Sequence, residues 1–133
     1  MNSVHSKDAP AAIGPYSQAI VAPPGAQLVF CSGQIPLDPV SGELVQGDAA
    51  TQTGQVMKNL EAVLAAAGCR FADVARTTIY LSSMDDFAAV NEAYGSFLGD
   101  HRPARATVEV ARLPKNVAVE IDAIAVRPAL EIS

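Results

Sequence analysis

The stretch that decides the fold runs from Val74 to Val110, "VARTTIYLSSMDDFAAVNEAYGSFLGDHRPARATVEV". Its first nine residues, 74–82, alternate in character and are rich in β-branched side chains, which predicts a strand. Apolar residues then recur at helical spacing as far as Leu98, and Gly99 is suited to end that helix. Residues 106–110 alternate again. A strand, a helix and a strand in this order predict two parallel strands joined by a crossover helix.

On the N-terminal side of this unit, Asp48–Ala67 carries an apolar stripe at helical spacing, with Asp48 suited to cap its start. The first dozen residues resemble a loose lead-in. Two short strands follow at Ser17–Val21 and Gln27–Ser32, and the "PPG" between them at 23–25 has turn chemistry. This order predicts a hairpin.

On the C-terminal side, Val117–Val126, "VAVEIDAIAV", predicts the longest and most apolar strand. The turn "ARLPKN" before it predicts a second hairpin, with residues 106–110. We therefore expect one α+β domain over residues 1–133, a mixed sheet with both helices packed on one face. The other face would be apolar and uncovered, which an oligomer would remedy.

Composition excludes several classes of function. The net charge of −5 and the pI near 4.8 argue against a nucleic-acid surface, which needs clustered Lys and Arg. We expect no membrane span, no signal peptide and a cytoplasmic location, since no long apolar run occurs and Cys31 and Cys69 lack CxxC spacing. His5 and His101 lack ligand spacing, so we expect no metal.

Two charged residues lie inside strand patterns. Glu120 shares one face of its strand with Asp122 and Ile124, and it either points to solvent or lines a partly buried pocket with a role in proton handling. Arg105 is either a solvated charge at a strand end or a bidentate clamp for a carboxylate. On adjacent strands the two could also pair with each other. The residue pattern leaves these alternatives open.

Five segments carry a family resemblance: "APAAIGPYSQAI", "SGQIPLDPVSGEL", "NLEAVLAAAG", "TTIYLSSMDDFAAVNEAY" and "RPARATVEVARLPKNVAVEIDAIAV". Together they resemble the reactive intermediate deaminase family, also called Rid or YjgF-like, and its RidA-type subgroup. The resemblance runs from Ala9 to Arg127. It implies a chorismate-mutase-like α+β fold and a homotrimer with clefts between neighbouring subunits.

The implied activity is hydrolytic deamination of reactive 2-imino and enamino acids, such as 2-aminoacrylate, to 2-keto acids and ammonia. A protonated imine is already electrophilic, so the resemblance implies neither cofactor nor metal. Two other functions stay open: deamination of a pathway-specific enamine, such as an aminoacrylate derivative or an aminomuconate, and a non-enzymatic role as a small-ligand-binding or regulatory module.

The resemblance also implies site residues. Arg105 matches the family's carboxylate-binding arginine, and Glu120 matches the acidic residue that positions or activates water. Five further residues fall at pocket positions: Tyr16, Ser32, Gly33, Asn91 and Thr107. The chain departs from many relatives in three ways: Thr107 replaces a cysteine, Arg102 replaces an aromatic residue before the proline, and the segment 98–103 is shorter.

Overall fold

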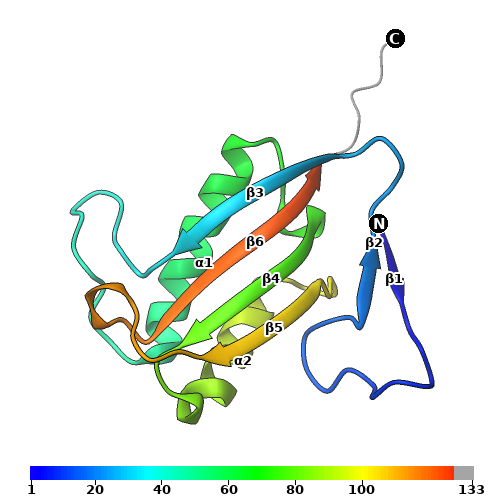
Figure 1. Ribbon diagram of the computed structural model, residues 1–133. Coiled ribbons are helices and arrows are strands. Elements are labelled where there is room, and N and C mark those ends of the chain that lie inside the picture. Colours follow the sequence, from blue (N-terminus) through cyan, green and yellow to red (C-terminus); the bar gives the residue numbers. More distant parts are fainter. Residues whose placement is uncertain (128–133) are drawn as a thin grey trace.

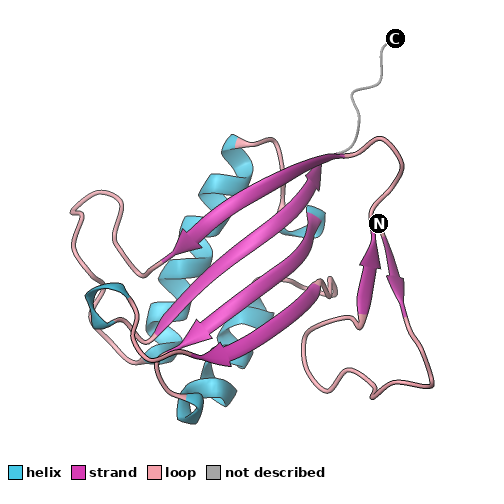
Figure 2. Ribbon diagram, viewed as in Figure 1, coloured by secondary structure: helices cyan, strands magenta, loops and turns pink. Residues whose placement is uncertain are grey.

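The computed structural model describes residues 1–127, and within them a four-stranded sheet lies against two helices (Figures 1 and 2). The strands have the order β3-β6-β4-β5. β6 is antiparallel to both β3 and β4, whereas β4 and β5 are parallel. Both helices cover the same face, as predicted. The elements are β3 (Gln27–Gln34), α1 (Ala49–Ala66), β4 (Val74–Leu81), α2 (Phe87–Ser96), β5 (Ala104–Glu109) and β6 (Val119–Arg127).

The predicted strand–helix–strand unit is confirmed as β4, α2 and β5. Its register pairs Thr77 with Arg105. Gly99 follows the helix with φ +57°, a left-handed conformation that suits glycine. The α1 prediction also holds, since the Asp48 side chain accepts a hydrogen bond from the Thr51 backbone N–H at 2.9 Å. The predicted cap therefore marks the start of α1, whereas α2 ends at Ser96, before the predicted Leu98.

Both predicted hairpins are wrong. The "PPG" turn forms, with the Ala26 N–H donating to the Pro23 carbonyl at 3.3 Å, but the strand before it does not pair with β3. β6 pairs with β3 and β4 instead, and β5 lies on the far side of β4. The long apolar β6 offers β3 a far more extensive ladder than a three-residue strand could. Period-two alternation sets which face a side chain occupies, and it does not identify the neighbouring strand.

The expected loose lead-in contains a strand. β1 (Asn2–Val4) pairs antiparallel with β2 (Ala19–Val21), and this β1–β2 ribbon stands apart from the main sheet (Figure 1). The Gln18 side chain holds the intervening loop by donating to the carbonyl of Pro10 at 2.6 Å. Ser17 forms a parallel bridge with Ala104, which ties the ribbon to the start of β5.

The core lies between the sheet and the helices. Along β6, Ile121 and its alternate neighbours are fully buried, whereas Glu120 and Asp122 lie on the outer face, as predicted. Within residues 1–127 no helix covers that outer face. Leu28 is 56% exposed there and Phe30 71%. The expectation of an uncovered apolar face therefore holds at β3, but Tyr80 and Asp122 make the β4–β6 part polar, joined by a hydrogen bond of 3.0 Å.

Candidate active site

Arg105 extends from β5 into the helix layer and sits in a cage of aromatic rings. Its register partner Thr77 bonds to Tyr94 of α2, so both side chains point toward the helices. The guanidinium carbon lies 5.1 Å from the ring centre of Tyr16, 5.4 Å from Tyr94 and 5.9 Å from Phe87. These distances are within cation–π range. The cage holds a half-buried cation in one orientation.

Asn91 fixes the guanidinium further, because its Oδ1 accepts a hydrogen bond from Arg105 Nη1 at 2.5 Å. Within residues 1–127 the Arg105 side chain makes this one hydrogen bond, which is to a neutral amide and uses one of the five guanidinium donors. Burial lowers the pKa of Arg105, and Tyr94 and Tyr16 oppose that change. Free, partly desolvated donors on a fixed guanidinium suit a planar oxyanion such as a carboxylate.

The "GPY" segment builds one wall of this cage. A Cβ on Gly14 would lie 3.3 Å from Arg105 Nη2, closer than most side chains tolerate. Pro15 packs against Gly95 of α2, where an added Cβ would lie 3.5 Å away. Tyr16 then places its ring on the guanidinium. Gly14 therefore leaves room for the guanidinium, Pro15 packs the segment against α2, and Tyr16 supplies the aromatic ring.

A second group of predicted residues lies on the outer face of the sheet. A Cβ on Gly33 would lie 3.0 Å from Glu120 Cδ, so the half-buried carboxyl group rests against the backbone of β3. Ser32 precedes Gly33 and is exposed. Tyr80 is the register partner of Glu120. The arrangement presents a carboxylate beside an unobstructed stretch of backbone.

Arg105 and Glu120 therefore lie on opposite faces of one sheet. Their strands are not adjacent, because β4 separates β5 from β6. This excludes the pairing on adjacent strands that the sequence left open. Within one chain the structure brings Tyr16, Asn91 and Arg105 together, and it places Gly33 beside Glu120 in a separate group.

Thr107 follows Arg105 on the same side of β5, since its register partner Ile79 is a core residue. Its Oγ1 is buried and has no hydrogen-bond partner within residues 1–127. A buried hydroxyl without a partner costs free energy. This side chain is therefore an unsatisfied group two residues from Arg105.

Sequence reasoning missed the roles of Phe87 and Tyr94, which it assigned only to the apolar face of α2. Tyr94 is fully buried, and its hydroxyl lies 2.8 Å from Thr77 Oγ1. A buried aromatic residue and a cage residue have the same spacing on a helix. The one available signal is that Phe87, Asn91 and Tyr94 recur at intervals of three and four, which puts them on one face.

Other reactive groups offer little chemistry. Burial raises the pKa of both Cys31 and Cys69, which disfavours their thiolates. Within the described range no group of three or more His, Cys, Asp or Glu residues could hold a metal. Residues 1–127 also contain no helix of the length and apolarity that crossing a bilayer requires.

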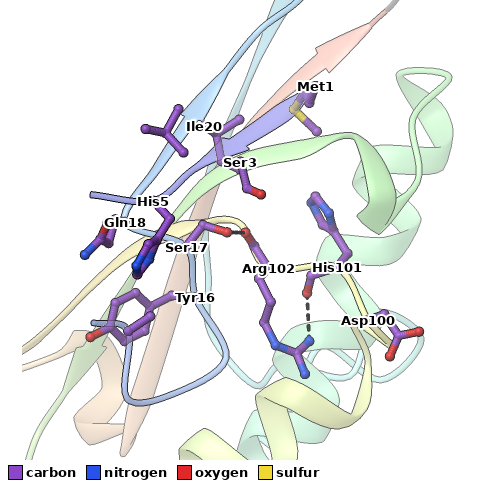
Figure 3. Close-up of a pocket in the computed structure, with 12 residues that line it drawn as sticks. Met1, Ser3, His5, Tyr16, Ser17, Gln18, Ile20, Asp100, His101 and Arg102 are labelled. Carbon is purple, nitrogen blue, oxygen red and sulfur yellow. Dashed lines mark hydrogen bonds between the residues drawn. The ribbon is translucent and has the colours of Figure 1, made fainter. Parts of the chain in front are cut away.

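A pocket of about 390 Å³ opens between the β1–β2 ribbon and residues 100–102 (Figure 3). His5 and Tyr16 stand on one side of it, and His101 and Arg102 on the other. Ser17 Oγ donates to the Arg102 carbonyl across the floor. The pocket shares Tyr16 with the Arg105 cage.

Comparison with known sequences gives close relatives over nearly the whole length. Protein DfrA of Myxococcus xanthus is 56% identical over 93% of this chain and 94% of its own. A protein of Rattus norvegicus named 2-iminobutanoate/2-iminopropanoate deaminase is 46% identical, over 93% of this chain and 88% of its own.

Solved structures agree with the fold. A Thermotoga maritima protein has a TM-score of 0.75 at 50% identity, covering 97% of this chain and 99% of its own. Escherichia coli TdcF with bound serine has a TM-score of 0.73 at 40% identity, covering 96% and 100%. Residues 6–127 match the family described as Endoribonuclease L-PSP. The chain therefore belongs to this family, which is the Rid/YjgF family.

Proposed function

We propose that this protein is a hydrolytic deaminase of 2-imino and enamino acids. The observation that carries the proposal is the caged Arg105, whose described bond is to a neutral amide and whose other donors suit a carboxylate. The deaminase names of mammalian relatives at 44–47% identity support it. The net charge of −5 disfavours an RNA substrate, despite the family's description.

In the proposed reaction Arg105 binds the substrate carboxylate and orients the imine carbon. Glu120 takes a proton from a water molecule as the water oxygen bonds to that carbon. Glu120 returns this proton to the nitrogen of the carbinolamine, the C–N bond breaks as the hydroxyl group becomes the ketone, and the departing ammonia takes up the hydroxyl proton. A protonated imine and one water thus give a 2-keto acid and an ammonium ion. The requirement is orientation, which a fixed guanidinium and a seated carboxylate can supply.

The same proposal includes a homotrimer, in which Arg105 of one chain faces Glu120 of another. One chain presents these groups on opposite faces of its sheet, so a complete site needs a second copy. The exposed Phe30 and Leu28 on the outer face give that copy an apolar surface to bury. A closed three-fold ring would then form three equivalent sites.

The test couples the purified protein to a threonine or serine dehydratase, with semicarbazide competing for the imine. We expect the protein to accelerate 2-keto acid formation and to lower semicarbazone formation. Light scattering checks the trimer in the same preparation. No acceleration over buffer would overturn the deaminase and leave a ligand-binding role.

Two variants test the roles of the charged residues. Arg105→Ala should abolish acceleration while the circular dichroism spectrum and the oligomer stay unchanged. Glu120→Gln should lose turnover but still bind a product 2-keto acid. The matched control is Lys58→Met, which removes one exposed charge from α1 and should match the wild type. Full activity in either site variant would remove that residue from the mechanism.

A further inference from the structure

The pocket beside the β1–β2 ribbon has the size of a ligand site. Its volume of about 390 Å³ falls within the range of roughly 300–1,000 Å³ typical of small-molecule pockets. Its lining includes the apolar residues Val4, Ala12 and Ile20. Its polar lining residues include His101 and Arg102, which lie side by side in Figure 3. The pocket therefore suits a small molecule with an aliphatic stem and a polar end.

This pocket adjoins the Arg105 cage through two residues. Tyr16 lines the pocket and also stacks on the Arg105 guanidinium at 5.1 Å. Ser17 lines the pocket and pairs with Ala104, the residue before Arg105. A molecule whose carboxylate binds Arg105 would therefore have this pocket beside its remaining atoms.

Arg102 is held ready for an anion in the pocket wall. Its Nη1 donates to the carbonyls of Gly99 at 2.7 Å and His101 at 2.9 Å. Within residues 1–127 the hydrogen bonds of this guanidinium use Nη1 alone. The Nη2 and Nε donors form the edge that binds a carboxylate in a bidentate manner. The two backbone bonds fix the orientation of that edge.

Few charged side chains line the pocket. Among the described lining residues Arg102 carries a permanent positive charge, and Asp100 is an exposed carboxylate. Burial raises the pKa of Tyr94, and the hydrogen bond with Thr77, then Arg105 and Arg102, oppose that rise. Arg102 is therefore the group of this pocket that an anionic ligand end would bind.

We propose that this pocket binds the substrate side chain and that Arg102 makes it select 2-imino acids carrying a second carboxylate. This inference rests on the proposed deaminase function. Arg102 is thus a specificity-determining residue: Arg105 holds the carboxylate next to the imine, and Arg102 holds the distal one.

The experiment compares two substrates formed in place by amino-acid oxidases, 2-iminoglutarate from glutamate and 2-iminobutanoate from 2-aminobutyrate. The readout is the ratio of their kcat/KM values, measured by semicarbazide competition. For Arg102→Met we expect this ratio to fall roughly tenfold to a hundredfold, the effect of losing a charged hydrogen bond. Arg102→Lys should retain part of the preference for 2-iminoglutarate, and Lys58→Met should keep the wild-type ratio.

Stable product analogues give a second readout that needs no turnover. Calorimetric titration compares the binding of 2-oxoglutarate and 2-oxobutanoate. Relative to the wild type, Arg102→Met should bind 2-oxoglutarate more weakly and 2-oxobutanoate with the same affinity. If Arg102→Met still accelerates hydrolysis of 2-iminobutanoate and its kcat/KM ratio equals that of the wild type, the proposed selectivity is wrong and the deaminase proposal is unaffected. Acceleration of neither imine by the wild type would overturn both proposals.

Discussion

The carboxyl group of Glu120 rests against the backbone of Gly33 on the neighbouring strand β3. A Cβ added at position 33 would lie 3.0 Å from Glu120 Cδ and closer still to Oε2. The φ of Gly33 is not in the left-handed region, so backbone conformation does not explain the glycine. The close approach of the Glu120 carboxyl group does. The contact ties the position of a proposed catalytic group to the absence of a side chain.

Gly33→Ala should lower turnover with little loss of stability. The added methyl group displaces the end of a flexible side chain, so the free energy of unfolding should change by less than about 1 kcal/mol. Turnover should fall about tenfold to a hundredfold, because the carboxylate leaves its position. Steady-state kinetics and urea unfolding measure the two effects.

Gly54→Ala is the matched control on α1, where an added Cβ meets nothing within 4 Å. Replacing a glycine inside a helix should raise the free energy of unfolding by about 0.5–1 kcal/mol and leave turnover unchanged. Equal turnover in Gly33→Ala and Gly54→Ala would show that the seat of Glu120 has no importance.

Asn91→Asp should weaken the proposed binding of a carboxylate by Arg105 while preserving the fold. The new carboxylate would accept the Arg105 bond that Oδ1 now accepts, and it would neutralise the guanidinium. We expect KM to rise about tenfold or more, with the melting temperature unchanged or higher. A raised KM together with a lowered melting temperature would instead indicate general disruption of α2.

Thr107→Val should stabilise the protein, because it removes a buried hydroxyl without a partner. We expect a gain of about 1 kcal/mol in the free energy of unfolding. Thr77→Val is the matched comparison on the adjacent strand, since it would leave the Tyr94 hydroxyl unpaired and should cost about 1–3 kcal/mol. Destabilisation of similar size in both variants would mean that Thr107 Oγ1 has a partner in solution.

Mixing two inactive variants tests whether a site takes residues from two chains. Arg105→Ala and Glu120→Gln should each be inactive alone. After unfolding and refolding together in equal amounts, about three quarters of random trimers are mixed, and each has roughly one intact site in three. Activity should then recover to about a quarter of the wild-type value. No recovery would show that Arg105 of one chain and Glu120 of another do not form a site together.

Periodicity and capping carried most of the fold. The alternation of β4 and β5 and the apolar stripe of α1 follow from which side chains must be buried, and local patterns encode that directly. Strand partners did not follow, because β6 satisfies the same alternation beside β3, β4 or β5. The short β1 has too few residues for a pattern, and its pairing with β2 depends on the loop that Gln18 holds.

The candidate site was less accessible to pattern than the fold. Glu120 stands out among apolar neighbours, so its face could be predicted from the strand period. The Arg105 cage could not, because Tyr16, Phe87 and Tyr94 come from a loop and a helix that meet only in the folded chain. The sequence therefore does not show that aromatic rings surround Arg105.

The placement of Arg105 and Glu120 on opposite faces of one sheet has a kinetic consequence under the proposed function. A newly synthesised chain would fold as an inactive monomer, and it would gain deaminase activity only after assembling with other copies. Specific activity would then fall on dilution below the concentration at which the ring dissociates. The cell would obtain more than proportional activity from each increase in the amount of this protein.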